Sequence, residues 1–348
     1  MAAKSAIEWT DATWTPVRAR NTATGKLGWH CAHVSEGCRN CYAEAINLRL
    51  GTGLAYKRGH LDEIEIFFDE TMLLAPLHWR KPRMIFVGSM TDLFADFVPD
   101  AWLDKIFAVM ALCPQHTFQV LTKRPERMRK FTLPTCDLPV LGRLPLERVH
   151  FEAQSGVEPW ESLKRYANLY SLYCSVPWPL PNVWLGVSCE DQATADARVP
   201  DLLATPAAVR FVSAEPLLGP LDLRWALSRP IEIAAGFRAR GQFSPGLEKL
   251  RRLDWIIVGG ESGPGARPMH PDWARSIRDQ CNAAGVAFHF KQHGEWLHEN
   301  QVGWWPHGDE ALERHRHAED FWRVGKKVAG RLLDGVEHNG IPKARTAP

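Results

Sequence analysis

Six short runs of consecutive apolar residues recur along the chain. They are continuous rather than alternating, which is typical of parallel strands that are covered on both faces of a sheet. Each run ends in small or polar residues, at the position where α/β folds place their chemistry. The runs occupy residues 84–88, 118–122, 183–189, 209–214, 255–260 and 286–291. A further strand is expected near residues 14–17.

Helical patterns lie between the predicted strands. One begins at Pro99 and Asp100, and another begins at Pro271 and is expected to end at Gly285. Successive runs start 26 to 65 residues apart, which leaves room for a crossover helix each time. We therefore predict an α/β fold built on a partial or complete parallel (βα) barrel, with a doubly wound open sheet as the alternative.

The same spacing predicts how the chain is organised. The barrel is expected to span residues 1–298, with insertions at residues 131–182, rich in Pro, Leu and Trp, and at residues 226–253, which are basic. Residues 299–348 change in pattern and are expected to form a C-terminal extension packed on the barrel.

The amino-acid composition is typical of a folded globular protein. Of the 348 residues, 45% are hydrophobic and 24% are charged, so a large core is available and disorder is not expected. No apolar run reaches the roughly 18 residues of a membrane span, and residues 1–10 lack the apolar segment of a secretory signal. We expect a cytoplasmic protein without a membrane partner. Its eight cysteines then suggest metal binding or simple burial rather than disulfides.

Three of those cysteines are clustered. Cys31, Cys38 and Cys41 have the spacing C-x6-C-x2-C in a loop that runs into a predicted helix. Thiolates suit zinc or iron–sulfur sites, and three protein ligands leave one metal position open, which in a [4Fe–4S] cluster is one iron. The alternative is a closed zinc site with His30 or His33 as fourth ligand. The remaining cysteines are scattered and are expected to be small core residues.

At these residues the chain resembles the radical S-adenosylmethionine superfamily. The superfamily spacing is C-x3-C-x2-C followed by an aromatic residue; Cys38, Cys41 and Tyr42 match its second half, and the first gap is longer here. More narrowly, the chain resembles, nearly end to end, an uncharacterised three-Cys-motif family of bacterial and phage proteins. Residues 18–30 depart from that family by extending the loop before Cys31. The resemblance is carried by residues 7–14, 34–44, 88–94, 119–128, 184–188, 213–217 and 258–264.

The resemblance implies a radical S-adenosylmethionine barrel whose three cysteines hold a [4Fe–4S] cluster. The cluster would reduce S-adenosylmethionine to give a 5′-deoxyadenosyl radical that abstracts hydrogen from a substrate. Tyr42 would pack near the adenine, and Gly88, Ser89 and Asp92 would hold the methionine amino group. A plain strand-to-helix turn with Asp92 as a cap is the alternative for that segment.

Other predicted strand ends supply further candidates. Besides the three cysteines, Glu215 and Lys123 are candidate catalytic residues: Glu215 for a ribose hydroxyl or the substrate, and Lys123, with Arg124, for a carboxylate or phosphate. Ser188 is a candidate for the cofactor pocket. Glu261 follows two glycines like the methionine-binding segment of the superfamily, but it lies too late in the chain and is retained only for its strand-end position. Residues 190, 291 and 293 are weaker candidates.

These features predict an iron–sulfur, S-adenosylmethionine-dependent radical enzyme. Its substrate is unknown, with a nucleic acid or nucleotide as the leading hypothesis, and it would need an electron donor and could also have a partner protein. The competing interpretation is a zinc-stabilised, non-enzymatic binding protein on a barrel scaffold. A zinc-dependent hydrolase is a third, weaker interpretation, because it needs a general base beside the zinc and Glu44 is the only nearby carboxylate with helical placement.

Overall fold

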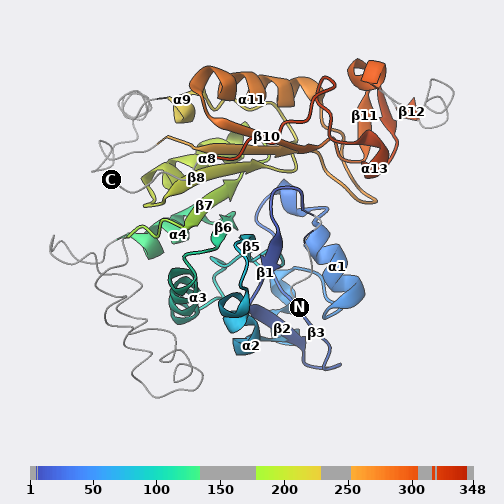
Figure 1. Cartoon of the computed structure of the whole chain (residues 1–348). Coiled ribbons are helices and arrows are strands. Elements are labelled where there is room, and N and C mark those ends of the chain that lie inside the picture. The colour runs from blue at the N-terminus through green and yellow to red at the C-terminus, as the bar shows by residue number, and fades with distance from the viewer. Residues whose placement is uncertain are drawn as a thin grey trace.

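A parallel sheet of seven strands forms the centre of the computed structural model (Figure 1). The structure describes residues 5, 7–133, 178–228, 252–304, 316–317 and 320–342. The strands lie in the sheet in the order in which they occur in the chain, without the reversal that defines a doubly wound sheet. The sheet is therefore a half-barrel with β1 and β10 as its edges. Its strands are β1 (Ala12–Trp14), β5 (Met84–Val87), β6 (Thr117–Thr122), β7 (Val183–Ser188), β8 (Val209–Ala214), β9 (Trp255–Gly259) and β10 (Ala287–Gln292).

Helices cover the outer face of this sheet and bury the main hydrophobic core against it. Asp191 caps α8 with a side-chain bond to the backbone of Thr194, and Gly285 ends α11 in the left-handed conformation at φ 61°. The helices are α1 (Tyr42–Leu50), α2 (Glu70–Leu74), α3 (Asp100–Leu112), α4 (Pro125–Thr132), α8 (Gln192–Ala204), α9 (Arg224–Leu227), α11 (Pro271–Ala284) and α13 (Lys326–Ala329). Short 3₁₀ helices occur at η1 (Glu36–Cys38), η2 (Arg58–Glu63), η3 (Ala75–His78) and η5 (Glu299–Trp304).

Aromatic side chains fill the inner face of the half-barrel. Trp255 lies at its centre, with ring centroids 5.7 Å from Phe211 and 5.8 Å from Trp184, while Trp9 packs on Phe86 at 4.8 Å. The arrangement requires a glycine on β7, because a Cβ at position 186 would lie 2.5 Å from the Phe211 ring. These rings therefore fill the inner face of the half-barrel.

Two small antiparallel sheets flank the half-barrel. One has the order β3-β2-β4 and the other β11-β13-β12. The first was not expected, since residues 18–30 read as an extended loop; they instead contain most of β2 and all of β3. The strands are β2 (Val17–Asn21), β3 (Leu27–Gly28), β4 (Ile64–Phe68), β11 (Trp296–His298), β12 (Arg316–His317) and β13 (Phe321–Arg323).

Residues near the C-terminus lie along the β10 edge of the half-barrel. Asn339 bridges His289 in the antiparallel sense, and the backbone of Gly340 donates to Phe288 at 2.9 Å. The Trp255 indole also donates to the Gly340 carbonyl at 2.8 Å. The outer edge of β10 is thus covered by the chain itself.

The fold agrees with the partial parallel barrel that the sequence predicts. The six later strands match the predicted runs to within one residue at each end, and α3 and α11 begin where expected. The first strand lies slightly earlier than predicted, at β1. Most of the two predicted insertions, residues 134–177 and 229–251, and much of the predicted extension lie outside the described residues. In the described part of the chain, no helix is long and apolar enough to cross a membrane.

Candidate functional site

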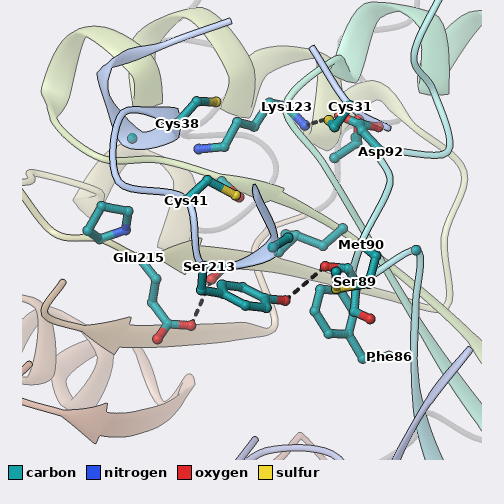
Figure 2. A pocket seen from close by; sticks show the side chains of 18 of the residues that line it. Cys31, Cys38, Cys41, Phe86, Ser89, Met90, Asp92, Lys123, Ser213 and Glu215 are labelled. Atoms are coloured by element: carbon teal, nitrogen blue, oxygen red, sulfur yellow. Dashed lines mark hydrogen bonds between the residues drawn. The ribbon is translucent and has the colours of Figure 1, made fainter. Parts of the chain in front are cut away.

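A cavity of about 220 Å³ opens at the carboxyl ends of the parallel strands (Figure 2). That volume far exceeds the roughly 10–15 Å³ that one water needs, so it has room for an organic ligand. Of the weaker candidates, Lys291 lines this cavity, whereas Glu190 and His293 do not. Every leading site residue predicted from the sequence lines it, although they come from widely separated parts of the chain. They are Cys31, Cys38, Cys41, Tyr42, Gly88, Ser89, Asp92, Lys123, Ser188, Glu215 and Glu261.

The three clustered cysteines occupy one side of the cavity. Cys38 ends η1, and Cys41 is the residue that precedes α1. Burial raises the pKa of the Cys31 thiol to about 12 and also raises the pKa of Cys41. Among the described residues, no three His, Cys, Asp or Glu side chains stand together as a set of metal ligands. The three thiols line the cavity, but in this structure they are not grouped around a common metal position.

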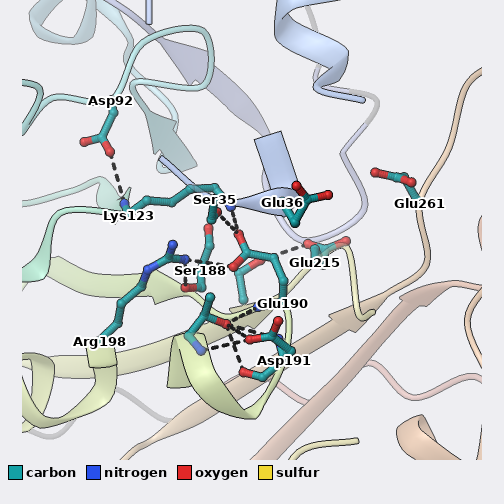
Figure 3. A network of polar contacts seen from close by, with 12 residues as sticks. Ser35, Glu36, Asp92, Lys123, Ser188, Glu190, Asp191, Arg198, Glu215 and Glu261 are labelled. Atoms are coloured by element: carbon teal, nitrogen blue, oxygen red, sulfur yellow. Dashed lines mark hydrogen bonds and ion pairs between the residues drawn. The ribbon is translucent and has the colours of Figure 1, made fainter. Parts of the chain in front are cut away.

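A buried carboxylate at the end of β7 fixes the first half of the cysteine loop (Figure 3). Glu190 is fully buried and accepts a hydrogen bond from Ser35 at 3.0 Å. It also forms ion pairs with Arg198 of α8, at 3.0 Å, and with Lys123, which follows β6. Gly37 lies so close that a Cβ would contact the Glu190 carboxylate. The loop therefore depends on a carboxylate more than 150 residues away in the chain.

A second carboxylate, Glu261 at the end of β9, fixes the other half of the loop. Asn40 donates to Glu261 at 3.0 Å, and Arg267 binds both carboxylate oxygens at 2.6 and 2.8 Å. The same arginine reaches the backbone carbonyl of Glu36 at 3.0 Å. These bonds account for much of the hydrogen-bonding capacity of Glu261, so its clearest role is to hold the loop. Arg267 is therefore engaged by Glu261 and by the cysteine loop.

The turn after β5 brings Gly88, Ser89 and Asp92 to the cavity. Gly88 has φ 72°, and a Cβ there would lie 2.6 Å from the Thr91 carbonyl, so the turn requires glycine. Tyr42 donates its hydroxyl to the Ser89 carbonyl at 2.9 Å. The turn is thereby tied directly to the start of α1.

Asp92 has little capacity left for a ligand. Its carboxylate accepts hydrogen bonds from the Arg124 guanidinium, the Thr122 hydroxyl and the backbone amides of Lys123 and Phe94, at 2.7–3.0 Å. This pattern favours the turn-capping role over direct binding of an ammonium group. Arg124 is likewise paired with Asp92 and also donates to the Ala32 carbonyl at 3.1 Å.

Lys123 lies close to the cysteines. In Figure 2 its side chain extends between Cys38 and Cys41, and burial lowers the pKa of its ammonium group. Lys123 and Arg198 share the single carboxylate of Glu190, whereas Arg124 and Asp92 balance each other. This end of the cavity therefore carries an excess of one positive formal charge beside the thiols.

The opposite end of the cavity carries a balanced ion pair. Glu215, after β8, lies 3.1 Å from the Lys291 ammonium of β10 and accepts from Ser213 at 3.1 Å. To reach β10, the Glu215 side chain crosses β9 at Gly259, where a Cβ would lie 2.5 Å from its carboxylate oxygen. The two predicted catalytic residues thus lie in two separate ion pairs, Lys123 with Glu190 and Glu215 with Lys291.

Neither histidine considered as a fourth zinc ligand lines the cavity. His33 is paired with Glu44 at 2.9 Å, and Glu44 also accepts from the Tyr56 amide at 2.6 Å. The His30 ring packs on Tyr56 and Phe97, and burial lowers its pKa to about 4. Both histidines thus lie outside the cavity that the cysteines line, and Glu44 is engaged by His33 and by the Tyr56 amide.

Several residues of the site were missed or ranked low by sequence reasoning. Glu190 and Lys291 ranked below the main candidates, while Asn40, Arg198 and Gln292 were not considered. Asn40 and Gln292 had recognisable signals, because one lies inside the cysteine motif and the other directly follows a predicted strand. Arg198 had none, since an arginine within a helix is normally exposed.

Comparison with known proteins identifies a family but no activity. A family model described as a protein of unknown function, DUF5131, matches residues 4–342. Neither the curated proteins nor the solved structures include a match to the chain.

Proposed function

The chain belongs to the DUF5131 family, whose function is unknown, and we propose that it is an iron–sulfur, S-adenosylmethionine-dependent radical enzyme. The observation that carries the proposal is the position of Cys31, Cys38 and Cys41. All three line one cavity at the carboxyl end of a parallel half-barrel, together with the turn after β5. The resemblance of the cysteine motif to the radical S-adenosylmethionine superfamily supports the same assignment.

The chemistry of the donor set fits a [4Fe–4S] cluster. Three thiolates would ligate three irons and leave the fourth open for S-adenosylmethionine, and the cluster would supply the electron that reductively cleaves it. The cavity beside the thiols provides room for that partner. The positive charge of Lys123 favours the thiolate of Cys41 and so opposes the burial that raises the pKa of this thiol. Binding requires the three side chains to turn toward a common centre.

The protein itself would position the cofactor and exclude water. The aromatic inner face closes the bottom of the cavity, so a reactive species formed above it is shielded from solvent on that side. The backbone of the turn after β5, with Ser89, together with Ser188 and Tyr42, remains the proposed binding surface for the cofactor. Asp92 and Glu261 act mainly by fixing the turn and the cysteine loop. We assign the activity to the cytoplasm, with an electron donor and a nucleotide or nucleic acid substrate.

Iron and sulfide analysis of protein prepared and reconstituted without oxygen tests the proposal. We expect about four irons per chain, as a [4Fe–4S] cluster requires, with broad visible absorption and cleavage of added S-adenosylmethionine. Cys38→Ala should lose the iron, whereas Cys281→Ala, a buried core cysteine of α11, should retain it. One tightly bound zinc without iron uptake would overturn the proposal.

That last result would favour the alternative of a zinc-stabilised binding protein. The alternative needs a fourth ligand beside the thiols, and the position of His30 and His33 outside the cavity that the cysteines line weighs against it. The radical enzyme is therefore the better-supported function.

A further inference from the structure

We propose that His270 and His298 form an acid-sensitive contact that joins the β11-β13-β12 sheet to the half-barrel and thereby controls how firmly the cysteine loop is held. The inference goes beyond the proposed function, because both histidines lie outside the cavity and their contact needs neither a cluster nor a substrate. The observations that carry it are the closeness of the two imidazole rings, the hydrogen bonds that their Nδ1 atoms accept, and the contacts of the sheet with residues 263–266.

The two imidazole rings belong to different parts of the fold. His270 is the residue before α11 and His298 ends β11, and their ring centroids lie only 4.4 Å apart; Figure 1 shows β11 beside α11. Phe321 of β13 is the register partner of His298 and packs on both rings, at centroid distances of 4.7 and 6.2 Å. His298 is 7% exposed. Because the contact is buried and surrounded by aromatic carbon, it favours two uncharged imidazoles.

Each ring also accepts a backbone hydrogen bond through its Nδ1 atom. The backbone amide of Asp272 donates to His270 at 3.2 Å and so caps α11. The backbone amide of Asn300, at the start of η5, donates to His298 at 3.1 Å. A nitrogen that accepts a hydrogen bond carries no proton, so in both neutral rings the proton lies on Nε2. Protonation of either ring would place two N–H groups against each other at Nδ1 and break the bond.

The charged groups around the two rings do not remove this cost. Burial, and then the neighbouring His270, lower the pKa of His298. The nearby carboxylates are those of Glu299, Asp320 and Asp272, and they oppose the shift only in part. Asp272 lies 3.6 Å from the His270 Nδ1 and offers that ring a partner when it is protonated, so His298 is the more sensitive of the two. Since its folded-state pKa is lowered, the contact is fully formed at neutral pH and weakens as the pH falls below the unfolded value of about 6.5.

The β11-β13-β12 sheet in turn holds a segment that fixes the cysteine loop. Residues 263–266 accept hydrogen bonds from the Trp296 indole at 2.7 Å and from the Arg323 guanidinium at 2.6 and 3.0 Å. Within the same segment, the Gly265 carbonyl accepts from Asn40, inside the cysteine motif, at 2.7 Å. Loss of the histidine contact would therefore loosen the sheet, then residues 263–266, and with them one of the bonds that hold the cysteine loop.

Hydrogen exchange of the full-length apoprotein, read by mass spectrometry, tests the inference. After correction for intrinsic exchange, the protection of residues 295–300 and 321–323 relative to β8 should fall by about three- to tenfold from pH 7.5 to pH 5.5, because an imidazole of unfolded pKa about 6.5 is about tenfold more charged than neutral one unit below it. Asparagine accepts the same backbone bond but does not titrate, so His270→Asn/His298→Asn should abolish this response. His60→Asn, at a histidine of η2 paired with Glu63, is the matched control and should leave the response unchanged.

The thiols of the cysteine loop give a second readout. Labelling of Cys41 by a dipyridyl disulfide, divided by the rate for unfolded protein at the same pH, should be at least about twofold faster at pH 5.5 than at pH 7.5 in the unmodified protein and not in the asparagine variant. An unchanged protection, or an acid response that persists in the asparagine variant, overturns the inference. Faster exchange without faster labelling overturns the link to the cysteine loop. If the double variant does not fold, His298→Asn alone takes its place, and none of these measurements depends on iron.

Discussion

Replacing Glu190 by glutamine should destabilise the protein strongly, because this carboxylate joins the cysteine loop to β6, β7 and α8. Its side chain is 1% exposed and lies 3.0 Å from Arg198. At an effective dielectric of about 20, that separation gives an attraction of about 5 kcal/mol, much of which desolvation offsets. Removing one partner of a buried ion pair costs about 3–5 kcal/mol. We expect a loss of that size, since Glu190→Gln would leave Lys123 and Arg198 facing each other without a carboxylate.

The loss can be read from thermal and urea unfolding of the apoprotein. With an unfolding entropy of roughly 2 cal/mol/K per residue, a loss of 3–5 kcal/mol lowers the Tm of 348 residues by about 4–7 °C. Glu126→Gln removes an exposed carboxylate that pairs with Lys130, and it should leave the Tm unchanged. A Glu190→Gln protein that melts within about 1 °C of the unmodified protein would refute the reasoning, because that shift corresponds to less than about 1 kcal/mol.

Three further substitutions test other parts of the fold. Gly186→Val should push against the Phe211 ring and cost about 1–3 kcal/mol, visible as a lower urea midpoint; an unchanged midpoint would show that the inner cluster can yield. Burial lowers the pKa of His289 to about 4, so stability should rise as the pH rises from about 4 to about 6.5. His289→Leu should remove that part of the pH dependence of the Tm, and an unaltered slope would contradict the assignment. A hydrogen bond from Arg275 holds the pKa of Asp334 well below its usual range, so its contribution is present above about pH 4 and is lost as the pH falls through the lowered pKa. Asp334→Asn should therefore lower the Tm at pH 7 and approach the unmodified protein in acid, whereas a constant gap at all pH values would argue against it.

The central sheet could be predicted because its strands are buried on both faces. A mainly apolar run such as residues 209–214 is too short to span a membrane and lacks the polar face of a surface helix, so a buried strand is the structure that it favours. The polar residue after each run then locates the carboxyl edge. The small sheet around β2 could not be predicted in this way. The sequence of β2, Val-Arg-Ala-Arg-Asn, alternates between apolar and polar residues over only five positions, and its neighbour β3 has only two residues. The position of β2 in the sheet is therefore fixed by its pairing with β4, which lies far along the chain.

The predicted site residues could be expected to meet because parallel strands end at one edge. Their partners could not be predicted, because pairing depends on how far each strand and loop projects. Glu190 and Ser35 are 155 residues apart, and Asn40 and Glu261 are 221 apart. As a result, the sequence predicts that the carboxylates of Asp92 and Glu261 bind a ligand, whereas in the structure they accept hydrogen bonds from other residues of the protein.

The covered edge of β10 has a consequence for how an open sheet avoids pairing with another copy. A sheet with an exposed edge is a template for such pairing, and a fully closed barrel avoids it by having no edge. Here residues 338–340 occupy hydrogen-bonding groups of Phe288 and Phe290, so the half-barrel does not offer its β10 edge to another copy although it is not closed.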